Sequence, residues 1–216
     1  MKRKLSFLLF VIFLFTSCLG VNADIVLNRN GSGTITLQYQ ISQSLDALGR
    51  LDGNERWNTI PVGRADFQRT LDRLPGMRLL SFSSREDEKN INITVKMEFA
   101  NIQTLLDFMD AGGRRSSFYG DARSGTISLT LNEGRNASGA PSAFPIDDLL
   151  AEVFESYSIR IGMTFPDEGS LAVTDAQGRA LNPGRELQAR GRRVFGSFSV
   201  FEILSSAEGI NLVFSW

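Results

Sequence analysis

Residues 24–41 have the sequence DIVLNRNGSGTITLQYQI, in which two runs of alternating apolar residues flank Asn30-Gly31. Asn-Gly between such runs is the strongest short-range signal for a β-hairpin, because both residues tolerate a positive φ. In the second run the apolar positions are Ile35, Leu37, Tyr39 and Ile41. The alternation predicts two antiparallel strands with one face toward the core and the other toward water.

The residues after this hairpin predict a mixture of helices and strands. Apolar residues recur at helical spacing in 64–74 and in 102–109. Apolar and polar residues alternate, as in half-buried strands, in four further runs: 77–83, 90–99, 116–119 and 126–131. The order predicts an α+β fold, with antiparallel sheet(s) of short strands and amphipathic helices packed on one face.

The composition changes at residues 132–145, which are poor in apolar residues and rich in Gly, Ser, Ala and Pro. Such a segment predicts a linker or a long loop. It divides an α+β domain at 24–131 from a C-terminal α+β lobe at 146–216, which is either separate or part of the same domain. The lobe is expected to hold a helix near 146–154, strands at 158–165 and 170–173, a helix begun by the capping box of Ser199 and Glu202, and a final strand at 210–216.

Residues 1–17 have the pattern of a signal peptide. Lys2, Arg3 and Lys4 precede the apolar run 5–15, which is shorter than the about 20 residues of a membrane-spanning helix. Two processing routes compete. In one, residues 15–18 are a lipobox, with Phe15 where Leu is usual, and Cys18 becomes the lipidated N-terminus. In the other, an ordinary signal peptidase cuts after Ala23. Cys18 is the only cysteine and lies at lipobox spacing, so we predict lipidation at Cys18.

The composition excludes several kinds of chemistry. The chain has no histidine and one cysteine, so it offers no Ser-His or Cys-His pair and no zinc site built from thiolates. Without the three basic leader residues, 20 basic residues stand against 24 acidic ones, a net charge of −4 that does not favour nucleic acid. We therefore expect no enzyme, no cofactor and no metal. A hydrolase that uses two carboxylates stays the alternative, with acids at 86–88, 147–148 and 167–168.

Arginines gather between residues 179 and 193 beside aromatic residues. Arg190, Arg192 and Arg193 are the candidates for contact with an anionic ligand, such as a lipid headgroup or a phosphate. The alternative interpretation is a solvated loop and strand edge.

The last residues alternate up to Trp216, as in the closing strand of an outer-membrane β-barrel. A small barrel needs about eight strands of roughly ten residues, and the predicted helices leave too little chain for them. We keep a small outer-membrane barrel as an alternative and expect a final strand that faces the core.

Several motifs resemble a group of uncharacterised spirochaetal, treponeme-type envelope proteins. They are the leader that ends in Ser17-Cys18 and the segments 30–39, 51–57, 60–62, 66–67 and 97–101. More distantly, the Gly-Ser-Gly hairpin followed by helices on a sheet resembles the LppM-like domain of mycobacterial envelope lipoproteins. That resemblance implies a periplasmic domain with a lipid-binding cavity, and it offers no catalytic residues to carry over.

Together these features predict a non-enzymatic lipoprotein of the bacterial cell envelope. It would be tethered to a membrane through Cys18, on the periplasmic side or at the outer surface, and would bind a lipid or an envelope protein.

Overall fold

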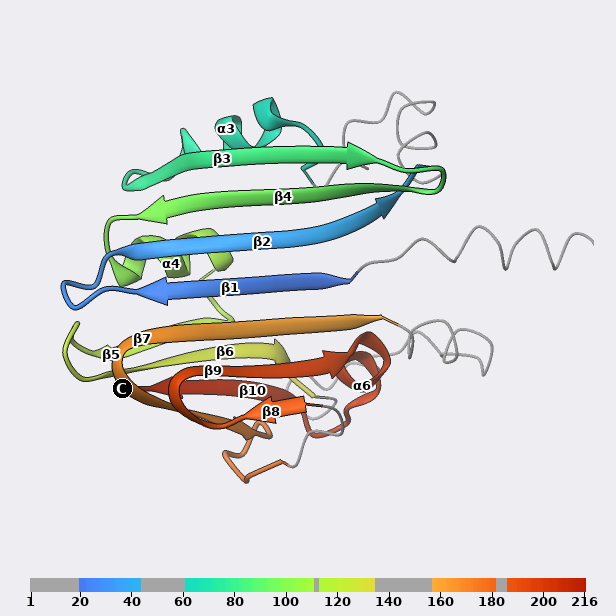
Figure 1. The fold of residues 1–216 in the computed structure, drawn as a ribbon. Coiled ribbons are helices and arrows are strands. Elements are labelled where there is room, and N and C mark those ends of the chain that lie inside the picture. Colours follow the sequence, from blue (N-terminus) through green and yellow to red (C-terminus); the bar gives the residue numbers. More distant parts are fainter. Residues whose placement is uncertain (1–19, 44–60, 111–112, 135–156, 182–185) are drawn as a thin grey trace, which may run out of the picture.

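The computed structural model describes residues 20–43, 61–110, 113–134, 157–181 and 186–216 (Figure 1). Within these ranges the N-terminal half has six strands and two helices: β1 (Val21–Leu27), β2 (Gly33–Ser42), α3 (Arg64–Leu71), β3 (Met77–Glu86), β4 (Asn90–Phe99), α4 (Ile102–Met109), β5 (Ser116–Gly120) and β6 (Gly125–Asn132). The C-terminal half has β7 (Ser158–Thr174), β8 (Glu186–Gln188), β9 (Arg190–Ser199), α6 (Val200–Ser205) and β10 (Ile210–Ser215). The fold is therefore α+β and dominated by sheet. The predicted helix at 146–154 lies outside the described residues.

All ten strands belong to one mixed sheet. The strand order is β3-β4-β2-β1-β7-β10-β6-β5, with β9 paired to β7 and β8 paired to β9. β1 and β7 run parallel, whereas the other pairs are antiparallel. The expectation of purely antiparallel, short strands is thus corrected on both counts, since β7 has 17 residues. A parallel neighbour needs a long crossover rather than a hairpin, so no local turn signal announces it.

The long strand β7 joins the two parts of the sheet. Residues 159–164 pair with β1 on one side and β9 on the other, while residues 170–174 pair with β10. Between them the register with β9 shifts, in the segment that contains Pro166. Proline lacks a backbone N–H and is tolerated at such irregularities. Beyond the shift β7 turns. Figure 1 shows β10, β6 and β5 behind a front layer that consists of β3, β4, β2, β1, the first part of β7, and β9.

The core lies between this front layer and the strands behind it. Its largest fully buried side chains come from both halves of the chain and include Phe99, Phe165, Phe198 and Phe214. Gly169 makes room for one of them, because a Cβ at that position would lie 2.1 Å from the Phe165 ring. In the described ranges the end strands β3 and β5 are not paired with each other, so the sheet is open. The closure that the alternative of an outer-membrane barrel requires is not found among the described strands.

The helices lie in three separate places. α3 packs beside β3, where the Phe67 and Phe82 ring centroids are 5.8 Å apart, and its first turn is capped by Asp66, which accepts from the Gly63 N–H at 2.9 Å. α4 lies behind β2 and β1 (Figure 1), and α6 continues directly from β9. The prediction that the helices share one face is not confirmed, because the strands behind the front layer cover much of that face themselves. None of the helices in the described ranges combines the length and apolar character needed to cross a membrane.

Candidate functional site

The front of the sheet carries a polar face, which we define by the outward residues of β4, β2, β1, β7 and β9. They include Thr94, Lys96, Glu98, Thr34, Thr36, Gln38, Asn22, Asp24, Val26, Arg160, Thr164, Arg193, Phe195 and Ser197. The other side of the same strands forms the core, with residues such as Ile25, Ile35 and Val95. In Figure 1 no helix lies in front of β4, β2 and β1. Strand alternation thus places one wet face on the open side of the sheet, as the sequence predicts.

One row of this face crosses four strands in register: Gln38, Asn22, Arg160 and Ser197. The Asn22 side-chain amide donates to Gln38 Oε1 at 3.2 Å. The Arg160 guanidinium lies 4.0 Å from the centroid of the Phe195 ring, which comes from the next row on β9. Stacking on an aromatic ring holds a guanidinium in place.

Two atoms in this row lack partners. Asn22 Oδ1 and Arg160 Nε are the buried side-chain polar atoms that have no hydrogen-bond partner in the part of the chain that the structure describes. One is an acceptor and the other a donor, and their residues are cross-strand neighbours in the parallel β1–β7 pair. Buried polar atoms without partners cost free energy and call for an explanation. An acceptor such as a carboxylate would suit the Arg160 guanidinium, whereas Asn22 Oδ1 needs a separate donor.

Arg160 also has no ion pair with any described residue, unlike the nearby Arg193. Arg193 Nη2 lies 2.8 Å from Asp24 Oδ1, so its charge is compensated within the sheet. Gly162 lies between them on β7, and a Cβ there would come within 3.0 Å of the same Asp24 oxygen. The missing side chain therefore lets Asp24 reach Arg193, and Arg160 remains the uncompensated guanidinium of the face.

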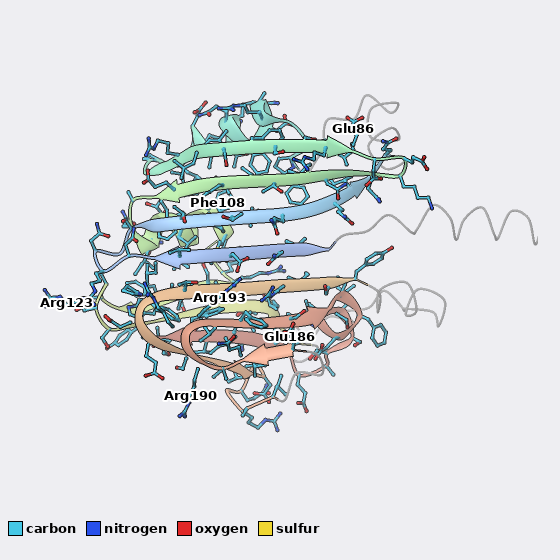
Figure 2. The ribbon with its side chains drawn as sticks, in the orientation of Figure 1. Glu86, Phe108, Arg123, Glu186, Arg190 and Arg193 are labelled. Carbon is cyan, nitrogen blue, oxygen red and sulfur yellow. The ribbon has the colours of Figure 1, made fainter. Side chains whose placement is uncertain are left out.

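The structure separates the three arginines that the sequence singles out. Arg193 is on the polar face with Asp24, and Arg192 Nε donates to the Phe165 carbonyl at 3.2 Å. Arg190 is exposed and lies well away from Arg193 in Figure 2. Successive strand residues point to opposite faces, and Gly191 has a φ of 123° that bends the strand between them. They do not form one cluster. Their proposed contact with an anionic ligand stays a prediction, as does lipidation of Cys18, which lies outside the described residues.

Two acidic residues of the hydrolase alternative, Asp87 and Asp167, have local roles in the structure. Asp87 accepts from the N–H groups of Lys89 and Asn90 at 2.9 and 2.8 Å, and these bonds hold its pKa below the usual range. Asp167 pairs with Arg29 at 2.8 Å. Asp147 and Asp148 lie outside the described residues. A general acid needs a raised pKa, so the direction at Asp87 is the wrong one for that role.

Asp175 is the buried carboxylate of the described chain, and it holds a turn. Burial alone would raise its pKa, but hydrogen bonds from the Arg179 backbone and side chain and from the Gln177 N–H outweigh burial and lower the pKa. No group of three or more His, Cys, Asp or Glu residues that suits a metal ion occurs in the described ranges.

Sequence reasoning missed Arg160 and Asn22. The alternation at 158–165 places Arg160 on an outward face, but only the β1–β7 register brings it beside Asn22. Asn22 is also hidden in the segment that reads as a cleavage site for signal peptidase.

The fold and this face define an open, mixed-sheet α+β domain with a polar face. No family model matches the chain, and no curated protein matches it. Among solved structures it is similar to the folded domain of the LppM protein of Mycobacterium tuberculosis, determined by NMR. The TM-score is 0.45 at 11% identity, over 92% of this chain and 89% of that one. The distant resemblance seen in the sequence thus has a counterpart in structure.

Proposed function

We propose that this protein is a lipid-anchored, non-enzymatic binding protein of the bacterial cell envelope whose polar face docks an acidic group of a partner protein on Arg160. The observation that carries the proposal is the Arg160 guanidinium, which is stacked on Phe195 and has no counter-charge among the described residues. A guanidinium held in this way is ready for a carboxylate, because little side-chain freedom is lost on binding.

The position of β1 supports the lipid anchor. The strand begins at Val21, and its first three residues pair with β2 on one side and with β7 on the other. Ordinary signal-peptidase cleavage after Ala23 would remove all three, including the buried Ala23. Cleavage before Cys18 would keep the strand whole. A strand in the middle of a sheet is costly to shorten, so the fold favours the lipobox route.

The shape of the polar face favours a protein over a lipid as its ligand. It is a broad, mainly polar surface spread over neighbouring strands, and it suits a surface of similar breadth better than an acyl chain. Lys96, which is exposed on β4, adds a second positive charge to the same face and has no ion pair among the described residues. An acidic partner surface matches both charges.

The anchor is tested by Cys18→Ser. We expect the variant to incorporate no labelled fatty acid and to leave the membrane fraction, because the thiol that carries the lipid is gone. Fractionation of cells that express the wild type and the variant measures this. A wild-type mature N-terminus at Asp24, found by mass spectrometry, would show that the anchor does not exist.

The binding face is tested by photo-crosslinking in cells, with a photoreactive phenylalanine analogue in place of the exposed Gln38. We expect a discrete protein adduct, and Arg160→Gln should reduce its yield about tenfold, corresponding to about 1.4 kcal/mol of binding energy. Arg160→Lys should not restore the yield, since a lysine lacks the planar fork.

The matched control carries the same analogue at Arg123, which lies at the far hairpin tip in Figure 2. Equal adducts at both positions, or an adduct that does not depend on Arg160, would contradict the proposal. Binding of the purified protein to anionic vesicles that is lost in Arg190→Gln would instead identify a lipid headgroup as the ligand.

A further inference from the structure

The end of the sheet where β1 begins gathers several segments. Val21 pairs with Tyr39 of β2 and with Ile159 of β7, and Ile159 pairs in turn with Phe198 of β9. α6 starts two residues beyond Phe198, and its first residue, Val200, donates its N–H to the Tyr157 carbonyl at 2.9 Å. The start of β1 and α6 therefore share one end of the molecule, at the right of Figure 1.

A lipid on Cys18 would hold this end close to a membrane. Leu19 and Gly20 alone separate Cys18 from Val21. Three residue steps span at most about 11 Å of extended chain. The polar zone on each side of a bilayer is itself roughly 5–8 Å deep. If the acyl chains begin at the edge of the hydrocarbon core, Val21 thus lies no more than roughly 3–6 Å beyond the outer edge of the polar zone.

α6 offers an apolar contact at the same end. Leu204 is 54% exposed, the most exposed aliphatic side chain among the large hydrophobic residues of the described chain, and Phe201 is half-buried beside it. The helix is held firmly: Ser199 Oγ accepts from the Glu202 N–H at 2.9 Å, and the Asn132 amide donates to the Ile203 and Ser206 carbonyls at 2.6 and 3.1 Å. Leu204 is therefore presented on a rigid support.

We infer that the end formed by α6 and the start of β1 rests on the bilayer, with Leu204 in the interfacial region. The polar face is then roughly perpendicular to the membrane plane. The inference rests on the proposed lipid anchor at Cys18. The same end bears charges of both signs, with Arg85 and Lys89 beside Glu86 in the β3–β4 hairpin and Glu202 on α6. These charges give no net attraction for negatively charged lipids, so we expect an apolar contact that such lipids do not strengthen.

The test uses the full lipidated protein in phosphatidylcholine vesicles, with a nitroxide on Leu204→Cys or, as the control at the opposite end, on Arg123→Cys. Each variant has one free thiol, because the only native cysteine carries the lipid. For each nitroxide we take the ratio of its collision rate with oxygen, which concentrates in lipid, to its collision rate with a water-soluble nickel complex. This ratio should be severalfold higher for the nitroxide on Leu204→Cys than for the nitroxide on Arg123→Cys. An added fraction of phosphatidylglycerol should not increase this difference.

Equal ratios at the two positions, with the acyl mass present on Cys18, would overturn the inference and leave the anchor standing. A protein mass without acyl groups would overturn both. A thermal midpoint equal to that of the wild type confirms that each variant is folded, as expected for exposed positions.

Discussion

A chain that begins at Asp24 is expected to be less stable than one that begins at Gly20 by at least about 3 kcal/mol, given about 1 kcal/mol for each hydrogen bond lost. Val21, Asn22 and Ala23 lie between two strands, facing Tyr39, Gln38 and Leu37 on β2 and Ile159, Arg160 and Ile161 on β7. Their removal unpairs backbone groups on both neighbours. It also uncovers core at Ala23, which is 6% exposed.

Urea unfolding of the two chains, followed by far-ultraviolet circular dichroism, gives the difference in unfolding free energy. A chain that begins at Val21 is the matched control and should resemble the one that begins at Gly20. Equal midpoints for the Gly20 and Asp24 chains would mean that β1 does not need its first three residues. The fold would then no longer argue against cleavage after Ala23.

Phe165→Ala is expected to cost about 3–5 kcal/mol of unfolding free energy, the usual range for a buried phenylalanine. Phe165 is 1% exposed at the turn in β7, where its ring stacks on Trp216 with centroids 5.5 Å apart. Gly169 packs directly against the ring, so the vacated space lies against backbone that cannot readily collapse into it. The loss of the ring would destabilise the turn in β7 that connects the two parts of the sheet.

The matched control is Phe118→Ala, which removes the other ring stacked on Trp216, at 6.0 Å. Phe118 is only half-buried, so its loss should cost clearly less. Thermal and urea unfolding measure both variants. If the two substitutions cost the same, the turn in β7 does not depend on Phe165.

Much of the local structure could be predicted from the sequence, because short-range chemistry specifies it. The hairpin at 24–41 is confirmed, with Leu27 opposite Gly33 and the turn between them, although β1 starts three residues before the predicted strand. The helix at 102–109 has the predicted bounds, and Ser199 caps α6 as its spacing from Glu202 indicates. Alternation, capping side chains and turn residues act over a few positions, so they can be recognised in a single sequence.

The tertiary structure decided how those elements meet. The parallel contact of β1 with β7 brings Asn22 beside Arg160, and it has no local signal because neither strand carries a turn that points to the other. The same register places Asp24 within reach of Arg193 and so removes that arginine as a free cation, while Arg160 is left without a counter-charge. The choice among possible strand neighbours depends on burying all the apolar faces in one core at once. That condition belongs to the whole chain, and no stretch of the sequence expresses it alone.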